Sequence, residues 1–226
     1  MYKSQITFTL DTICPWTYIA KKRLGKALEQ VAASPDAEKV SFTFVFRPYQ
    51  LNPEFPSEPQ DKRHWFKTEK HDASDVKQSV YEATMSELGA AVGIDFSWGG
   101  TFSNTFNAHR VIQHFQESKG SETANRLVDA LYSRYFEREQ NQGAKDVLVE
   151  ACVEADISEA EAREIVEDET EGKIDTKNMI RMSAIDGVDA VPHVVIEGRR
   201  RDLTLIGAKE VEEYVKALNT IIKESK

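Results

Sequence analysis

Cys14 is the residue of this chain best placed to do chemistry. It stands between Ser4–Leu10, whose alternating apolar residues predict a β-strand, and a segment reaching Val31 whose apolar residues recur at helical spacing. Pro15 suits the first position of that helix, where a missing N–H group costs nothing. A thiol at this junction faces unpaired backbone N–H groups and the positive end of the helix dipole, and both favour the thiolate. The spacing therefore predicts a nucleophilic thiolate at Cys14.

Cys152 is the second cysteine, and it lies in a stretch, residues 147–153, that is typical of an amphipathic helix. A free cysteine in such a place is commonly buried and inert, and we expect this of Cys152. The alternative is a remote resolving thiol for Cys14. That role depends on a Cα separation that a sequence does not give.

His109 is the histidine with the most catalytic-looking surroundings, since it stands next to Arg110 in a predicted helix. It could act as a base or orient a substrate near neutral pH. A histidine on a helix is more often a hydrogen-bonded packing residue, which is the competing interpretation. Other histidines have no ligand-like spacing with a cysteine or a carboxylate cluster, so no metal site is predicted; these are His64, His71 and His114.

Two regions with strand character frame the chain. After the first helix, Val40–Phe46 predicts a second strand, and a parallel pair joined by a helix requires a right-handed crossover. Towards the other end, Gly187–Gly198 predicts a loop, a proline and a strand. Leu203–Ile206 predicts its hairpin partner, with the turn at Gly198–Arg201 and a last helix at Ala208–Lys223.

Between these regions, from about Glu58 to Ile185, helical spacing replaces the strand pattern. The predicted helices are Lys62–Lys70, Ser74–Val92, Phe102–Glu117 with Ser103 as its cap, Ser121–Arg138, Ala144–Ala155, Ser158–Glu167 and Lys173–Ile185. A helical block of this length is typical of an inserted subdomain and not of a loop. We therefore predict an α/β protein with one discontinuous domain, 1–57 and 186–226, and an inserted helical subdomain, 58–185.

The composition limits the partners. The 226 residues, 40% of them apolar and 30% charged, are ordinary for a globular protein. A net charge of −9 argues against a nucleic-acid partner, and no apolar run approaches the length of a membrane span. Residues 1–5 lack the apolar stretch of a signal peptide. The chain also has only two cysteines, which does not indicate a framework of disulfide bonds. We therefore expect a cytoplasmic protein in a reducing compartment.

The order strand, Cys14–Thr17, helix resembles the active-site turn of thioredoxin-fold oxidoreductases. It is most similar to the DsbA-like branch often called FrnE-type, which is related to kappa-class glutathione transferases and 2-hydroxychromene-2-carboxylate isomerases. Arg47–Pro53 resembles the loop after the second strand of that family, and Gly93–Phe96 and Asn104–Arg110 resemble a recurring signature. The resemblance covers nearly the whole chain. It implies a thioredoxin fold with a large all-helical insertion between the second and third strands.

The resemblance also implies the site. Cys14 would be the nucleophile, with Thr17 and Pro192 as further catalytic positions. Val191-Pro192 resembles the cis-proline dipeptide that faces the active-site cysteine, and its backbone would pair with an extended peptide or with glutathione. The implied substrate- or glutathione-binding residues are Pro15, Trp16, Asn52, Val191, Ala208 and Lys209. Ala208-Lys209 departs from the Ser-Asp pair associated with glutathione recognition in the kappa-class relatives.

Thr17 is the departure that governs the mechanism, because the family motif usually reads Cys-Pro-Trp-Cys and a threonine cannot resolve a mixed disulfide. Cys14 would then need an external thiol, with glutathione as the expected co-substrate and no bound cofactor. Thr17 could instead donate its O–H group to the thiolate.

Three functions follow. The first is a DsbA-like thiol–disulfide oxidoreductase that works with a single cysteine and glutathione. The second is a kappa-like glutathione transferase or isomerase acting on a small metabolite, for instance an aromatic one; the position matching Cys14 is usually serine there and steadies a bound glutathione thiolate. The third is a non-catalytic binding scaffold. A homodimer, common among the kappa-class relatives, remains open.

Overall fold

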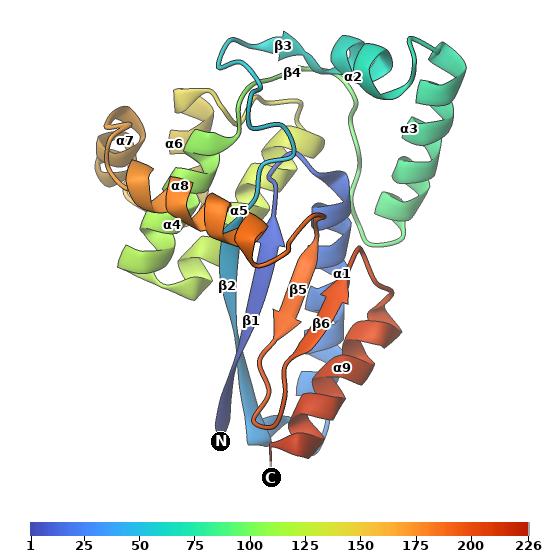
Figure 1. The fold of residues 1–226 in the computed structure, drawn as a ribbon, viewed down its shortest axis with the longest axis vertical. Helices are drawn as coiled ribbons and strands as arrows, with labels where there is room; N and C mark the ends of the chain where they lie inside the picture. Colours follow the sequence, from blue (N-terminus) through green and yellow to red (C-terminus); the bar gives the residue numbers. More distant parts are fainter. Residues whose placement is uncertain (226) are drawn as a thin grey trace.

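The computed structural model describes residues 1–225 and contains a four-stranded sheet in the order β2-β1-β5-β6. β1 (Tyr2–Leu10) and β2 (Val40–Pro48) run parallel, whereas β5 (His193–Ile196) is antiparallel to β1, and β6 (Leu203–Ile206) is antiparallel to β5 (Figure 1). The alternation in β1 buries Ile6 and Phe8 completely. The strands therefore form where their side-chain pattern predicts them.

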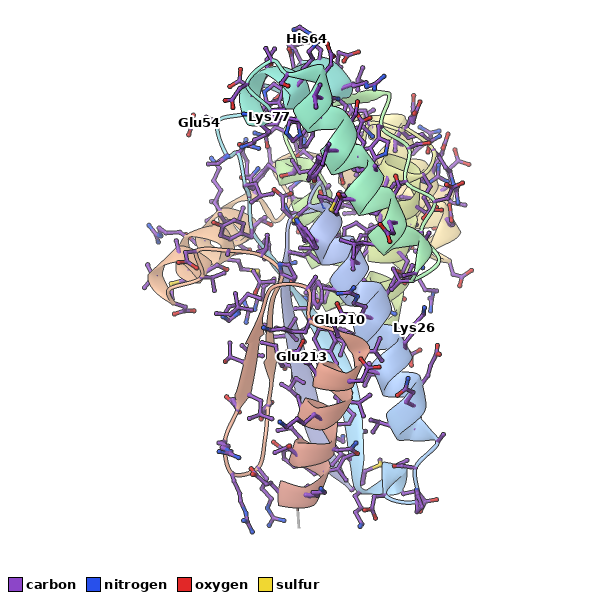
Figure 2. The ribbon with its side chains drawn as sticks, turned by 90° about the vertical axis from the view of Figure 1, so that its right-hand side faces the viewer. Lys26, Glu54, His64, Lys77, Glu210 and Glu213 are labelled. Atoms are coloured by element: carbon purple, nitrogen blue, oxygen red, sulfur yellow. The ribbon has the colours of Figure 1, made fainter. Side chains whose placement is uncertain are left out.

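Two helices cover one face of this sheet. α1 (Pro15–Ala32) follows β1, and α9 (Val211–Glu224) closes the described chain and packs along α1. Figure 2 shows the two helices side by side, with Lys26 on α1 and Glu210 at the start of α9. Because α1 begins directly above the carboxyl end of β1, its N-terminal N–H groups point towards the sheet edge where β1 and β2 both end.

The segment between β2 and β5 is mainly helical and lies beside and above the sheet (Figure 1). Its helices are α2 (Lys62–Lys70), α3 (Asp75–Ala90), α4 (Phe106–Lys119), α5 (Ser121–Phe136), α6 (Lys145–Glu154), α7 (Glu159–Glu167) and α8 (Lys173–Ile185). α4, α5 and α8 pack against β2. None of the helices in residues 1–225 combines the length and apolar character needed to cross a bilayer.

The insertion is not purely helical, which corrects one detail of the prediction. β3 (Gln60–Asp61) and β4 (Thr101–Phe102) form a two-residue antiparallel ladder. Phe102 therefore belongs to a strand, and α4 begins at Phe106 instead of at Phe102. Ser103 does not cap that helix, because its hydroxyl bonds to Asn141 Oδ1 at 3.1 Å.

The start of the last helix also differs from the prediction. α9 begins at Val211, three residues after the predicted Ala208. Glu210 and Glu213 form a reciprocal capping box there, which satisfies backbone N–H groups of the first turn. The division into domains 1–57 with 186–226 and 58–185 stays a prediction. The buried apolar residues of both parts form one continuous core cluster.

Candidate functional site

Topology and register bring the predicted site residues to one edge of the sheet. β1 and β2 are parallel and in register from Tyr2 opposite Val40 to Leu10 opposite Pro48, so the segments after both strands leave the sheet at the same edge. Since β5 is antiparallel to β1, with His193 opposite Thr9, Pro192 lies at this edge as well. β6 ends there too, opposite His193, and leads into residues 207–209.

Cys14 lies at the beginning of α1. It occupies the N-cap in extended conformation, with Pro15 in the first turn as predicted. Its N–H donates to Asp11 O at 3.0 Å, and its carbonyl accepts the N–H of Thr17 at 3.1 Å. The Val191–Pro192 peptide bond is cis, and Cys14 Sγ lies 3.9 Å from Val191 O, the geometry of a weak S–H···O bond. Cysteine and proline therefore face one another across the sheet edge.

The predicted thiolate is not the resting state of this site. Cys14 is only 4% exposed, and burial raises the pKa of its thiol from an ordinary 9.0 to about 12. Hydrogen bonds from the backbone N–H groups of Thr17 and Trp16 lower this pKa, as the position at a helix N-terminus predicts, while the charge of Asp11 raises it. Desolvation outweighs the helix terminus, so the ligand-free protein holds a neutral thiol.

Thr17, in the fourth position of the motif, is completely buried and held from two sides. Its Oγ1 lies 2.6 Å from Cys14 O and 3.0 Å from Asp11 O, and it accepts the hydroxyl hydrogen of Tyr132 at 2.8 Å. The single hydroxyl proton is thus directed mainly at backbone carbonyls. The side chain of Thr17 also lowers the pKa of Cys14, although less than its backbone N–H group does.

Asp11 is a site residue that the sequence analysis missed. It is fully buried; its Oδ2 accepts the N–H of Leu51 at 2.7 Å, and its Oδ1 lies 3.4 Å from His109 Nε2. This side chain connects the segment after β2 to the turn that contains Cys14, and the buried His109 lies next to it. The sequence does carry a signal for Asp11. It is an acidic residue directly after a buried strand and three residues before a cysteine, and acidic side chains are rarely fully buried without a partner.

The predicted substrate-binding residues line the same edge. Trp16 is 40% exposed beside Cys14, and Asn52 follows Leu51, which Asp11 holds in place. The N–H of Gly207 donates to Pro192 O at 2.9 Å, which brings Ala208 and Lys209 close to the cis peptide.

Arg23 of α1 is a second residue that the prediction missed. Its Nη1 donates to Ala208 O at 3.1 Å and pairs with Glu210 at 2.9 Å. The backbone at Ala208 is therefore fixed by α1. Glutathione binding by the residues that the resemblance implies stays a prediction.

Cys152 lies in α6, is completely buried and is a free thiol, as is Cys14. Burial raises the pKa of Cys152 to about 12. Within residues 1–225, no group of three or more His, Cys, Asp or Glu side chains is arranged to hold a metal ion.

Solved structures support the same fold over nearly the full length. A probable DsbA oxidoreductase from Streptomyces coelicolor is 25% identical, with a TM-score of 0.83 over 98% of this chain and 91% of that one. The cytosolic disulfide reductase DsbM from Pseudomonas aeruginosa, solved with GSH, is 13% identical, with a TM-score of 0.63 over 97% of this chain and 99% of that one.

A 2-hydroxychromene-2-carboxylate isomerase is 13% identical, with a TM-score of 0.68 over 97% of this chain and 96% of that one. At such identities the last two structures show a shared fold alone. No curated protein sequence matches the chain. The sequence profile of the DSBA-like thioredoxin domain matches residues 5–219. The predicted resemblance is thus confirmed, and the chain belongs to the DSBA-like thioredoxin domain family.

Proposed function

We propose that the protein is a thiol–disulfide exchange enzyme that uses Cys14 alone and takes glutathione as its reductant in a reducing, cytoplasmic compartment. The observation that supports this most is the approach of Cys14 Sγ to Val191 O, with Thr17 and not a second thiol in the fourth position. Members of this family are thiol–disulfide oxidoreductases, and DsbM is a cytosolic disulfide reductase solved with GSH.

The chemistry begins when Cys14 loses its proton and its thiolate attacks a glutathionylated substrate. A bond forms between Cys14 Sγ and the glutathione sulfur, and the substrate leaves as a thiolate that takes up a proton. A second glutathione thiolate then attacks this mixed disulfide, which releases oxidised glutathione and regenerates Cys14. Over the whole cycle, one reduced glutathione is consumed: the substrate leaves as a free thiol, the glutathione taken from it leaves as half of oxidised glutathione, and Cys14 returns to its starting state.

Burial of Cys14 sets a condition on this cycle. A thiol with a pKa of about 12 carries almost no thiolate at neutral pH, so attack requires that water or a ligand reach the sulfur. The groups that lower its pKa are the backbone N–H groups of Thr17 and Trp16, which belong to the first turn of α1. Hydration removes the largest opposing contribution, which is burial.

The neutral thiol favours a second function. An S–H group at a helix N-terminus can donate a hydrogen bond to a bound glutathione thiolate without being attacked, which is the role that the resemblance to kappa-class relatives implies for the serine at this position. Cys14 would then support a glutathione transferase or isomerase.

The test is intact-protein mass spectrometry after incubation with oxidised glutathione, followed by reduced glutathione. We expect an adduct on wild type and on Cys152→Ser, none on Cys14→Ser, and release only when reduced glutathione is added. Thr17→Cys should release the adduct without added thiol, because the new thiol lies where a resolving cysteine stands in the family.

The alternatives give different patterns in the same experiment. Protection of Cys14 from alkylation by reduced glutathione, without any adduct, would favour the transferase. An unmodified Cys14 that glutathione does not protect would leave a binding scaffold and refute both enzymatic proposals.

A further inference from the structure

His109 is a buried histidine to which the proposed exchange reaction gives no task. It lies in α4, is 1% exposed, and its Nε2 lies 3.4 Å from Oδ1 of Asp11. An ionised carboxylate has no hydrogen to give, so the hydrogen between these two atoms belongs to Nε2. The imidazole therefore donates to a carboxylate that lies three residues before the nucleophile.

α4 is held at other points, and these contacts fix the place of the imidazole. One turn after His109, the side chain of Gln113 donates to Phe46 O of β2 at 3.1 Å. Arg110 is completely buried and donates to Ile165 O of α7 at 2.9 Å. The position of His109 is thus set by contacts with β2 and α7, and not only by its contact with the carboxylate.

Asp11 is tied in a similar way to the turn that contains Cys14. Its main-chain oxygen accepts the N–H of Cys14 at 3.0 Å and lies 3.0 Å from Oγ1 of Thr17. Its side chain is completely buried, and Oδ2 accepts the N–H of Leu51 at 2.7 Å. Among the described residues, each carboxylate oxygen thus has one donor, the amide of Leu51 or the imidazole of His109.

The charge of Asp11 acts on several acids. Burial raises the pKa of Cys14, of Tyr132 and of Tyr135, and the charge of Asp11 raises each of these pKa values further. Cys14 caps α1, and the two tyrosines belong to α5. α4 contributes His109, and the segment after β2 contributes a backbone N–H group. A carboxylate in this position opposes the ionisation of every acid near it, the nucleophile included.

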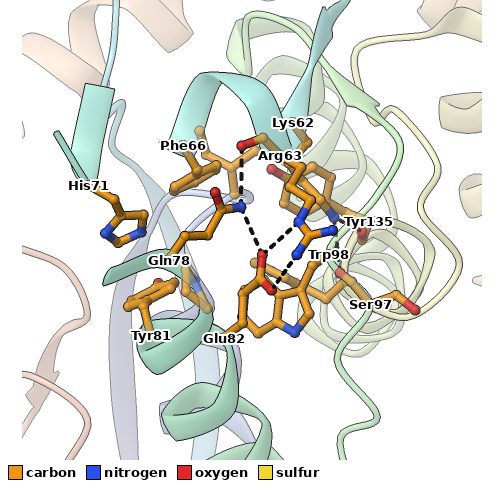
Figure 3. A pocket seen from close by; sticks show the side chains of 13 residues that line it. Lys62, Arg63, Phe66, His71, Gln78, Tyr81, Glu82, Ser97, Trp98 and Tyr135 are labelled. Atoms are coloured by element: carbon orange, nitrogen blue, oxygen red, sulfur yellow. Dashed lines mark hydrogen bonds and ion pairs between the residues drawn. The ribbon is translucent and has the colours of Figure 1, made fainter. Parts of the chain in front are cut away.

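Little water is present to screen this charge. A cavity lies between the active-site turn and helices α2 and α3, and its lining includes Tyr135 and the neighbours of Cys14, Ile13 and Pro15 (Figure 3). The volume of this cavity is about 20 Å³, room for roughly one water molecule. Charges interact more strongly where water is excluded, so we expect Cys14 to respond to a change in the charge of Asp11.

We propose that His109 is a positioning residue that acts through Asp11: its Nε2–H group holds the Asp11 side chain as a charged carboxylate, and this charge helps to keep the Cys14 thiol protonated in the ligand-free site. The proposal rests on the proposed function only for its consequence for exchange. Oxidants attack a thiolate and not a thiol, so the pair would protect the nucleophile until a substrate enters.

The experiment measures the rate at which iodoacetamide alkylates Cys14 at pH 8, by mass spectrometry, in proteins that carry Cys152→Ser. Asp11→Asn keeps the shape of the side chain and an acceptor for the N–H of Leu51, but it removes the charge. We expect alkylation to become roughly 3- to 10-fold faster, because the rate follows the thiolate fraction and removal of a nearby negative charge lowers the pKa of the thiol.

Two substitutions of His109 separate its donor from its bulk. The amide nitrogen of a glutamine can stand in the place of Nε2, whereas that of an asparagine reaches only the place of Nδ1. His109→Gln should therefore keep the rate. His109→Asn leaves the carboxylate with the N–H of Leu51 alone, which favours its protonated form, and the rate should rise roughly 3- to 10-fold. His114→Asn on the same helix is the matched control and should react at the unchanged rate.

The double variant shows whether the effect of His109 passes through Asp11. Alkylation of Asp11→Asn/His109→Asn should be as fast as that of Asp11→Asn alone, because the charge is already gone. A histidine that served only packing would instead loosen the site, and its effect would multiply with that of Asp11→Asn. Such a product, or an unchanged rate in Asp11→Asn, would overturn the proposal. If urea unfolding shows that His109→Asn folds poorly, a changed rate in His109→Gln would overturn it as well.

Glutathione takes no part in this measurement, so this proposal and the proposed function fail separately. The expected alkylation rates without a glutathione adduct on wild type would refute exchange and leave the control of the thiol in place. A glutathione adduct together with an unchanged rate in Asp11→Asn would support exchange and refute the control by Asp11 and His109.

Discussion

At the scale of single residues, Cys14 shows how far burial can outweigh a helix terminus. Its N-cap position and the N–H groups above it lower the pKa of the thiol, yet exclusion from water raises that pKa to about 12. The thiol of Cys14 is therefore protonated in the ligand-free site. Its reactivity is controlled by access of water and ligand more than by fixed charges.

The first prediction concerns the pH dependence of Cys14. The protonated form does not react, so the rate of alkylation by iodoacetamide in Cys152→Ser should rise about tenfold per pH unit from about pH 7 to pH 10 without levelling off. The rate is measured by mass spectrometry at each pH. A plateau at or below about pH 8 would mean that the helix N-terminus has a larger effect on the pKa of Cys14 than burial does.

The second prediction concerns the pair of Thr17 and Tyr132. Thr17→Val keeps the shape of the side chain but leaves the buried Tyr132 hydroxyl without its acceptor, so we expect a loss of about 1–3 kcal/mol in the free energy of unfolding. Adding Tyr132→Phe should cost less than the sum of the single changes. Urea unfolding of the four proteins measures the difference, and strict additivity would show that the hydroxyl groups do not interact.

At the scale of elements, α2 and α3 form a thin cover over the active-site turn. Asp61 Oδ1 accepts the N–H of His64 at 2.6 Å and so caps α2. Few residues of these two helices are fully buried, and Trp65, Tyr81 and Leu88 pack half-buried against the core. Because α2 is short, we expect its local stability to depend on its cap as well as on this packing.

The third prediction follows from this cap. Asp61→Ala should destabilise α2 by about 1 kcal/mol and raise the alkylation rate of Cys14 roughly fivefold at constant pH. Ser158→Ala is the matched control, since Ser158 caps the equally long helix α7 away from the turn, and its rate should stay that of wild type. If both variants react alike, α2 does not limit access to the thiol.

Element positions were largely predictable because they depend on local periodicity and on turn residues. The bounds of α2 and α8 agree with the pattern to the residue, and Gly120 ends α4 as expected. The predicted start of α4 was wrong because Phe102 pairs with Gln60, forty-two positions away, a contact that no local pattern reveals.

The chemistry of the site was predictable only in its location. The sequence places Cys14 and Val191-Pro192 at opposite ends of the chain, and their facing arrangement follows from the family resemblance. The protonation state of Cys14 depends on burial by residues far along the chain, and the bond from Tyr132 to Thr17 spans 115 positions. Neither the protonation state nor this hydrogen bond follows from the spacing of residues close to Cys14 in the sequence.

At the scale of the whole molecule, one core joins the sheet region to the insertion. Tyr18 of α1 stacks on Tyr132 of α5 with ring centres 4.8 Å apart and on Phe136 at 5.7 Å. Tyr18 also donates to Glu137 at the end of α5. The active-site helix is therefore packed against the inserted segment through several aromatic rings.

The fourth prediction is that the protein unfolds in a single transition. Because the core is continuous, circular dichroism at 222 nm and tryptophan fluorescence, which reports largely on Trp65 and Trp98 in the insertion, should give the same midpoint in urea. Two separated midpoints would show instead that segments 1–57 with 186–225 and 58–185 are independent folding units.

The placement of the chain ends has a practical consequence. The first and last described residues lie at the foot of the sheet in Figure 1, where Tyr2, Arg199 and Ser225 border a common groove, whereas Cys14 follows the opposite end of β1. A fluorescent protein, a purification handle or an electrode linker fused at either end would therefore point away from the thiol. The protein can be tethered through both of these regions at once, and the edge of the sheet that carries Cys14 still faces the solution.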